Sequence, residues 1–396
     1  MASSSFSSSI QSYSEPFTEE QEMALYRSIK MVRLRLKFFN GMGSTYVDAN
    51  PRFSLKRNIL NLLQNLQDIR KATHDINLKF KSIQEEMRVT AALTKLNKAF
   101  INHISGYESP SNPYFGATVG RVANRIGKAT FVVNGQRYNV SKNIGEDSLH
   151  GGTHGWSFKV WNATIVGNRV VMTLVSPDGD EGYPGSVTAT VSFQLSDDGE
   201  LRVKMKAKSG RATPINLTNH SYFNLAGHAT NAAELYKHVF TLNADRWTVT
   251  DSGSIPTGEI RSVDNSVMDL RTPTILGDVI DKVPGGGYDY NFCLPEPYDD
   301  RKTSFVAKVL HPASGRYLEV YSNQPGVQLY TSNSIPERNE TGIAGKNGAR
   351  YFRHAAFCLE TQNYPDAVNH KNFPNSILRP GDIYNHIVVY KFGVEN

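Results

Sequence analysis

The sequence of 396 residues is poor in cysteine and contains no long apolar runs. Its two cysteines, Cys293 and Cys358, form no Cys-x-x-Cys pair of the kind that binds zinc. Such scarcity excludes a disulfide-stabilised secreted scaffold and favours a reducing, cytoplasmic location. No stretch reaches the roughly 18 consecutive apolar residues of a transmembrane helix, so no membrane span is predicted.

Residues 1–14 are rich in serine but lack both an apolar segment and any lysine or arginine. A secretory signal needs both features, so this segment does not match one. We expect a disordered serine-rich tail over residues 1–18, with the ordered protein beginning after it.

Excess charge of one sign is also missing from most of the chain, although the formal net charge is +6. Residues 1–108 carry 15 lysines and arginines against 10 acidic residues, which accounts for nearly all of the excess. The remainder is almost neutral. A nucleic-acid partner, which would require a basic surface, is therefore not predicted, and an uncharged small molecule suits the charge balance better.

Residues 19–108 have a helical pattern. Apolar residues recur in alternating steps of three and four at Ile59, Leu62, Leu66, Ile69, Ile76, Phe80, Ile83 and Met87, if Thr73 fills one position. The pattern predicts a helical, coiled-coil-like region, for which two interpretations stay open. It is either a module for self-association or for binding a protein partner, or a helical hairpin that packs on itself or on the next domain.

After about residue 109 the period of the apolar residues changes from helical to two. Val187, Ala189, Val191 and Phe193 alternate with polar residues, and the stretch from Leu201 to Met205 does the same. Such alternation is typical of half-buried antiparallel strands, and no pattern of helix length interrupts them. The sequence therefore predicts a mainly β domain over residues 109–396, a large sandwich or open barrel.

Six blocks in this β region carry side chains that ordinary strands do not need. They are residues 120–126, 148–152, 216–225, 287–292, 324–328 and 358–366. In this order and at these separations they resemble the aldose 1-epimerase family, over about residues 112–392. The resemblance implies the large antiparallel β-sandwich of galactose mutarotase-like proteins.

The resemblance also implies a role for particular residues. Glu360 matches the general base of the family, His220 its general acid, and His150 a second histidine that polarises the ring oxygen of the sugar. Four further residues match those that hold the sugar hydroxyls, namely Asn124, Arg125, Asp289 and Gln328. The implied activity is the interconversion of the α and β anomers of free hexoses such as galactose and glucose.

The chemistry of that reaction fits these residue types. The C1 hydroxyl must lose a proton while the ring oxygen gains one, so that the ring opens to an aldehyde, rotates and closes again. One base and one acid on opposite sides of the same bond suffice, and a carboxylate with an imidazole supplies them. This route requires no cofactor and no metal. Tyr222, Phe223, Trp156 and Tyr364 are candidates for covering the apolar face of the sugar.

Each of these residues also has a purely structural interpretation. Glu360 could pair with a surface arginine, and His220 could be a hydrogen-bonded core histidine. Cys358, two residues before Glu360, should face the same side of a strand, and we interpret it as an inert packed thiol.

The sequence departs from the family at its start, because residues 1–108 show no counterpart of the β-strands that open these domains. Without them a sheet edge and part of the core would lack partners. Two alternatives to an active aldose 1-epimerase therefore stay open. One is a catalytically impaired sugar-binding or scaffold protein whose helical region is the working part, and the other is an epimerase of hexose phosphates.

Overall fold

The computed structural model describes residues 112–295 and 302–395. The predicted tail and the predicted helical region, residues 1–18 and 19–108, lie outside the described residues and stay predictions. Within the described part the fold is mainly β with a few short helices, as the period-two pattern predicted. None of the helices in that part has the length and apolar character needed to cross a membrane.

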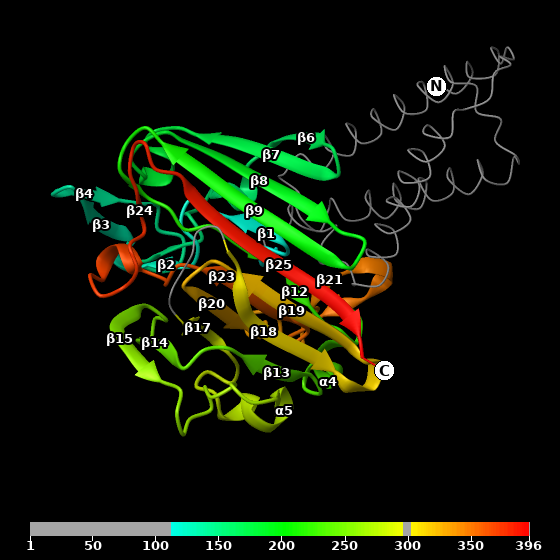
Figure 1. Cartoon of the computed structure of the whole chain (residues 1–396). Helices are drawn as coiled ribbons and strands as arrows, with labels where there is room; N and C mark the ends of the chain where they lie inside the picture. The colour runs from blue at the N-terminus through cyan, green and yellow to red at the C-terminus, as the bar shows by residue number, and fades with distance from the viewer. Residues whose placement is uncertain (1–111, 296–301, 396) are drawn as a thin grey trace, which may run out of the picture.

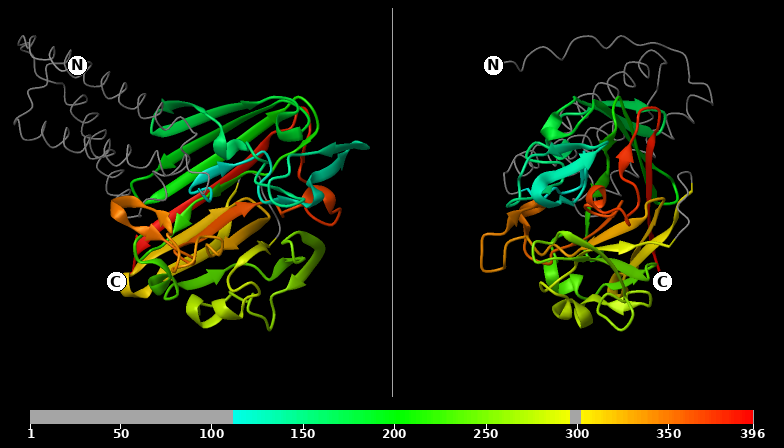
Figure 2. Two further views of the ribbon diagram at one scale, coloured as in Figure 1. Left: turned by 180° about the vertical axis from the view of Figure 1, so that it is seen from behind. Right: turned by 90° about the vertical axis from the view of Figure 1, so that its left-hand side faces the viewer.

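The larger of the two main sheets has nine strands and is antiparallel throughout (Figure 1). In spatial order the strands are β16 (Thr274–Ile275), β13 (Val239–Leu242), β18 (Ser304–His311), β19 (Arg316–Ser322), β25 (Tyr384–Val394), β9 (Glu200–Ser209), β8 (Val187–Leu195), β7 (Arg169–Ser176) and β6 (Asn162–Val166). The last strand of the chain, β25, lies between β9 and β19, in the middle of the sheet (Figure 2).

The second main sheet has six antiparallel strands and carries much of the chemistry described below. In spatial order they are β12 (Tyr222–Phe223), β23 (Phe357–Gln362), β20 (Gly326–Tyr330), β17 (Asp289–Cys293), β14 (Arg246–Thr250) and β15 (Pro256–Ser262). Strands far apart in the sequence are therefore neighbours, since β23 pairs with β12 on one side and with β20 on the other.

Short strand pairs and helices complete the described part. The pairs are β1 (Ala117–Val119) with β11 (Thr218–His220), β2 (Arg125–Ile126) with β5 (Ser148–Leu149), β3 (Thr130–Val133) with β4 (Gln136–Asn139), β10 (Thr213–Pro214) with β24 (Ile377–Leu378), and β21 (Ile343–Ala344) with β22 (Arg350–Tyr351). The α-helices are α4 (Asn231–Leu235) and α5 (Leu276–Val279), and the 3-10 turns are η1 (Gly127–Ala129), η2 (Trp156–Phe158), η3 (Asp180–Gly182), η4 (Ile280–Lys282), η5 (Pro312–Ser314), η6 (Lys346–Gly348) and η7 (Ala367–Asn369).

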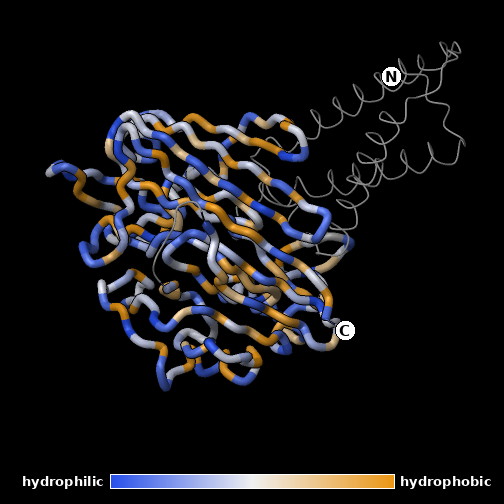
Figure 3. Tube along the Cα trace, viewed as in Figure 1, coloured by the Kyte–Doolittle hydropathy of each residue, from blue (hydrophilic) through white to orange (hydrophobic). Residues whose placement is uncertain are grey.

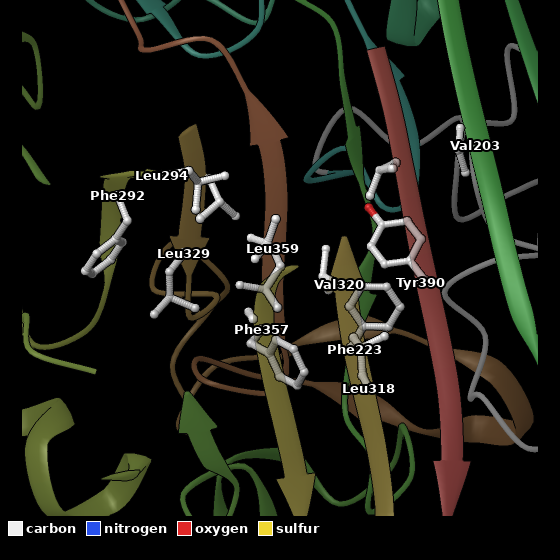
Figure 4. Packing of buried hydrophobic residues seen from close by; sticks show 14 of the residues in the cluster. Val203, Phe223, Phe292, Leu294, Leu318, Val320, Leu329, Phe357, Leu359 and Tyr390 are labelled. Carbon is white, nitrogen blue, oxygen red and sulfur yellow. The ribbon is translucent and has the colours of Figure 1, made fainter. Parts of the chain in front are cut away.

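One hydrophobic core joins the two large sheets. Val203, Leu318 and Tyr390 come from the nine-stranded sheet, and Phe357 and Leu359 come from the six-stranded sheet (Figure 4). Burial of apolar surface contributes about 25 cal/mol per Å². Burial of this shared core is therefore the main interaction that holds the two sheets together.

The alternation along the strands explains why one sequence serves both core and surface. Hydrophobic and hydrophilic residues alternate along the long strands (Figure 3), and in β8 Val187, Ala189 and Val191 are buried while the exposed Thr188 lies between them. Successive side chains of a strand point to opposite faces of its sheet. The strands predicted around residues 187–193 and 201–205 are confirmed as β8 and β9.

We expect a fragment beginning at Ser109 to unfold in one cooperative transition, because it contains the large core that joins the sheets in the described part of the chain. Urea unfolding followed by circular dichroism and by tryptophan fluorescence measures this. Coincident transitions are predicted. A fragment that aggregates, or whose two signals change at different urea concentrations, would show that residues 1–108 are needed for the fold.

Candidate active site

Strand β23 places a carboxyl group on the face of the six-stranded sheet that points away from the core. Phe357 and Leu359 pack into the core, so Cys358 and Glu360, which alternate with them, face the opposite side. The Glu360 residue is nevertheless only 2% exposed. A carboxyl group is thus buried beside a sheet, away from bulk water.

A histidine from a different part of the chain meets this carboxyl group. His220 ends β11, and β12 then pairs with β23 so that Tyr222 lies opposite Cys358. The pairing brings His220 Nε2 to 3.6 Å from Glu360 Oε1. The predicted acid and base, 140 positions apart in the sequence, are therefore neighbours.

The second predicted histidine, His150, is held by a turn that needs an unusual backbone. His150 and Asn124 both have positive φ angles, 52° and 61°. The two residues bond each other through the Asn124 N–H, which donates to His150 Nδ1 (3.1 Å), and the His150 N–H, which donates to the Asn124 carbonyl (2.9 Å). Because Nδ1 accepts, a neutral His150 carries its proton on Nε2.

The turn is tight because glycine follows His150. A Cβ atom on Gly151 would lie 2.1 Å from the carbonyl oxygen of Gly120. Gly151 also has a φ of +85°, which favours glycine. The His-Gly-Gly block singled out in the sequence therefore has a steric basis.

Polar side chains extend the site beside Glu360. Gln328 lies opposite Glu360 in the pairing of β20 with β23, and its Nε2 donates a hydrogen bond of 2.7 Å to Asp289 Oδ1. The Asp289 carboxylate also lies 4.0 Å from Arg125 Nη1. Carboxylate, amide and guanidinium groups of this kind bind hydroxyl groups.

The seven residues singled out in the sequence form one continuous cluster. Asn124 contacts His150, the His150 ring centre lies 5.3 Å from that of His220, and His220 adjoins Glu360. The backbone N–H of Asn124 contacts His150, and its side-chain Oδ1 accepts the N–H of Arg125. Its side chain thus shapes the turn that presents Arg125 and His150.

Burial disfavours charge on the Glu360 carboxyl group. Its pKa is raised well above 4.5, first by burial and then by the nearby negative charge of Asp289, and the positive charge of Arg125 opposes this only in part. The folded protein therefore tends to keep a proton on this group at a pH where a free carboxyl group would lose it.

Burial shifts the two histidines in the opposite direction. The pKa of His220 is lowered from 6.5 to about 3 by burial, although a hydrogen bond with its own backbone opposes the shift. The pKa of His150 is lowered well below 6.5 by burial and by the neighbouring His220 and Arg125. Both imidazole rings are therefore neutral over the physiological range.

Several polar atoms of the cluster lack a hydrogen-bond partner among the described residues. They are Arg125 Nε, Gln328 Oε1 and Glu360 Oε2. Buried polar atoms are almost always paired in folded proteins, so unpaired ones in a cluster need an explanation. A ligand rich in hydroxyl groups would satisfy both the donor and the two acceptors.

The same cluster contains donor atoms of the types that bind metals. One donor atom each from His220, Cys358 and Glu360 lies within 4.8 Å of the others. However, the thiol lies beside Nδ1 and the carboxylate beside Nε2, on different nitrogen atoms of the ring. No single nitrogen of the ring is therefore the neighbour of both the thiol and the carboxylate.

Three contacts of His220 were not predicted from the sequence. The rings of Tyr222 and Tyr114 stack on it, and the Cys358 thiol contacts its edge. Those contacts depend on strand register and on the turn before β1. The β-strand alternation did indicate that Cys358 shares a face with Glu360.

The aromatic residues suggested for the sugar face fare differently. Phe223 and Trp156 belong to the main hydrophobic core, so the suggestion was wrong for them. Tyr364 is 4% exposed and packs edge-on against Phe373. Tyr222 does lie in the site, but its ring covers His220.

Comparison with known proteins places the chain in a family. The family model described as aldose 1-epimerase matches residues 98–391. Galactose mutarotase from Homo sapiens is 48% identical over 282 residues, covering 71% of this chain and 80% of that protein. Aldose 1-epimerase from Escherichia coli is 31% identical over 289 residues, with coverages of 71% and 81%.

Solved structures show the same relationship. The aldose epimerase homologue from C. elegans superimposes with a TM-score of 0.63 at 28% identity, covering 70% of this chain and 82% of that one. Galactose 1-epimerase from Lactobacillus acidophilus gives a TM-score of 0.62 at 25% identity, with coverages of 74% and 83%. The chain belongs to the aldose 1-epimerase family, as its six blocks predicted, and is an enzyme of the epimerase type.

Replacing Glu360 by glutamine should stabilise the fold increasingly as the pH rises. In the wild type the folded state keeps a proton on Glu360 that the unfolded chain releases above pH 4.5, so this group costs stability as pH increases. The cost amounts to at most about 1.4 kcal/mol per pH unit, and glutamine removes it.

Urea unfolding at pH 5 and pH 8 measures this effect. The stability gained by Glu360→Gln is expected to be larger at pH 8, whereas Glu340→Gln, at an exposed carboxyl group, serves as the control and should show no such trend. An identical pH dependence for wild type and Glu360→Gln would contradict the assignment of a retained proton.

Proposed function

We propose that this protein interconverts the α and β anomers of free hexoses such as galactose and glucose. The observation that carries the proposal is a carboxyl group and an imidazole buried 3.6 Å apart, next to unpaired hydroxyl-binding groups. Further support comes from the relatives, which are named galactose mutarotase and aldose 1-epimerase.

In this proposal Glu360 and His220 share one mobile proton. For ring opening the proton lies on His220, which is an imidazolium, and Glu360 is a carboxylate. Glu360 takes the proton of the C1 hydroxyl, the C1–O5 bond breaks, and His220 Nε2 gives its proton to O5. The open aldehyde then lies beside neutral His220 and protonated Glu360, and closure on the other face of C1 reverses both transfers.

The proton must therefore move from Glu360 to His220 when sugar binds. Burial alone favours the uncharged pair, as the raised pKa of Glu360 and the lowered pKa of His220 indicate. Hydroxyl groups that donate to Glu360 Oε2, together with the positive charge of Arg125, favour the carboxylate. A sugar rich in donors is thus the ligand that prepares the pair for reaction.

The remaining residues of the cluster are assigned to binding. His150, with its proton on Nε2, donates to the ring oxygen region of the sugar. Asp289, Gln328 and Arg125 hold hydroxyl groups, and Asn124 orients the turn that carries Arg125. Each buried hydrogen bond left unmade would cost about 1 to 3 kcal/mol, so such groups select a ligand with many hydroxyl groups.

We also propose that residues 109–396 form one β-sandwich domain in a reducing, cytoplasmic setting. Support comes from the core shared by the two sheets and from the two cysteines, which are both buried and free. Residues 19–108 are proposed as a helical module that self-associates or binds a protein partner.

A catalytically impaired scaffold is the second candidate. The match extends over 80% of the Homo sapiens relative and 81% of the Escherichia coli relative, and residues 1–108 lack an evident counterpart of the opening strands. Strand β6 forms one edge of the nine-stranded sheet, and the apolar side chain of its Val166 is exposed there. Loss of rigidity of about 1 Å at the site would cost roughly a hundredfold in rate.

Polarimetry of freshly dissolved α-D-galactose and α-D-glucose tests the proposal. Wild type should speed the approach to the equilibrium rotation. Glu360→Gln and His220→Gln should each lower kcat by roughly a hundredfold or more, because each loses one of the two proton transfers.

Glu340→Gln, at an exposed carboxyl group, is the matched control and should behave as wild type. If wild type and Glu360→Gln give the same rate, the protein is not a mutarotase and the scaffold candidate stands. Activity on hexose 6-phosphates alone would instead favour the phosphorylated substrate.

A further inference from the structure

The imidazole of His220 stacks with two aromatic rings. The ring of Tyr222 is 5.0 Å away at an interplanar angle of 9°, and the ring of Tyr114 is 6.1 Å away at 15°. The two contacts fix the plane of the imidazole. They leave open which edge of the ring faces which way.

A stack alone cannot choose between the two orientations of an imidazole. A half-turn about the Cβ–Cγ bond keeps the plane but exchanges Nδ1 and Nε2 with the two ring carbons, and this torsion has two broad, similar minima. The contacts of the ring edge, together with the hydrogen bond that the ring makes with its own backbone, must therefore make the choice. Glu360 Oε1 lies 3.6 Å from Nε2, and Cys358 Sγ lies 3.5 Å from Nδ1.

We propose that Cys358 is a positioning residue for His220, and that its sulfur accepts a hydrogen bond from the Nδ1–H of the imidazole. This inference rests on the proposed function, in which Nε2 is the atom that exchanges a proton with the sugar. The sequence had suggested an inert packed thiol, whereas the contact gives that thiol a defined partner.

The proton balance requires the Nδ1–H in each step of the reaction. The imidazolium that begins ring opening carries protons on both nitrogen atoms. After Nε2 has given its proton to O5, the neutral ring keeps the proton on Nδ1. The sulfur of Cys358 therefore has the same donor before and after the transfer, and the ring need neither turn nor exchange its tautomer.

A thiol suits this position better than a carboxylate would. A carboxylate next to Nδ1 would stabilise the imidazolium and raise its pKa, which would make Nε2 a weaker acid. A thiol is a weak acceptor without charge. Burial raises the pKa of the Cys358 thiol well above 9, so the sulfur stays uncharged beside the ring.

Cys358 directs His220 without lying among the sugar-binding groups. It contacts Nδ1, the nitrogen of the ring that is not next to Glu360, and it is paired between Tyr222 and Tyr330 on the neighbouring strands. Its removal should therefore lower kcat and leave KM nearly unchanged. If Cys358→Ala only left a cavity in the fold, it would not lower kcat selectively in this way.

The chain offers a matched control. Cys293, on β17, is also fully buried, and it packs with Tyr364 and Phe373 in a separate cluster. Replacing it removes the same thiol from another strand of the same sheet, separated from β23 by β20. Cys293→Ala thus measures how much the loss of a buried thiol alone changes kcat.

The kinetic experiment compares three variants with wild type in the galactose assay. We expect Cys358→Ala to lower kcat about tenfold or more with KM within about twofold, because the ring loses its orientation. Cys358→Ser, whose oxygen accepts from Nδ1–H, should recover kcat to within about threefold of wild type. Cys293→Ala should match wild type in kcat.

Nitrogen NMR of the wild type labelled with ¹⁵N-histidine tests the same inference without activity. At neutral pH, His220 should be neutral with its proton on Nδ1, and the same tautomer should be seen in Cys358→Ser. In Cys358→Ala the signal should shift toward a mixture of tautomers. Since the wild type itself carries the signature, failure of a variant to fold does not remove the test.

Three results would overturn the inference. They are a wild-type His220 protonated on Nε2 alone, a folded Cys358→Ala with the kcat of wild type, and an equal loss of kcat in Cys293→Ala. Wild type without any mutarotase activity would instead refute the proposed function, and the NMR result would then stand alone. The two failures are therefore distinguishable.

Discussion

A buried carboxyl group and a buried imidazole that face each other form the contact on which this site depends. Glu360 and His220 are 3.6 Å apart, and burial opposes a charge on either one. A proton held by such a pair moves between its members more easily than it leaves for solvent. That property is what a reaction needs when it removes one proton and adds another without net change.

The fold supplies this contact through the same alternation that builds its core. On β23, Phe357 and Leu359 enter the core while Cys358 and Glu360 face the site. One strand thus has a face in the core and a face in the candidate site, and the packing that stabilises the domain also fixes Glu360, the proposed base. His220, the proposed acid, comes from the end of β11 and is brought to Glu360 by the pairing of β12 with β23.

Much of this arrangement was predictable from the sequence, and the rest required strand pairing. Period-two patterns predicted β8 and β9, and the six blocks predicted the family and the residues that the structure brings together. The stacking of Tyr114 and Tyr222 on His220 was not predictable, because it depends on register between distant segments. Phe223 was named as a candidate for covering the sugar, although it packs in the core, because residue type alone does not tell which face of a strand a side chain takes.

The most direct test of the proposed roles of Glu360 and His220 is a crystal structure of the Glu360→Gln variant with galactose bound. We expect a single pyranose between the two side chains, with its C1 hydroxyl within hydrogen-bond distance of residue 360 and its ring oxygen next to His220 Nε2. A sugar bound with C1 away from residue 360, or with its ring oxygen far from His220, would contradict the proposed roles of these two residues.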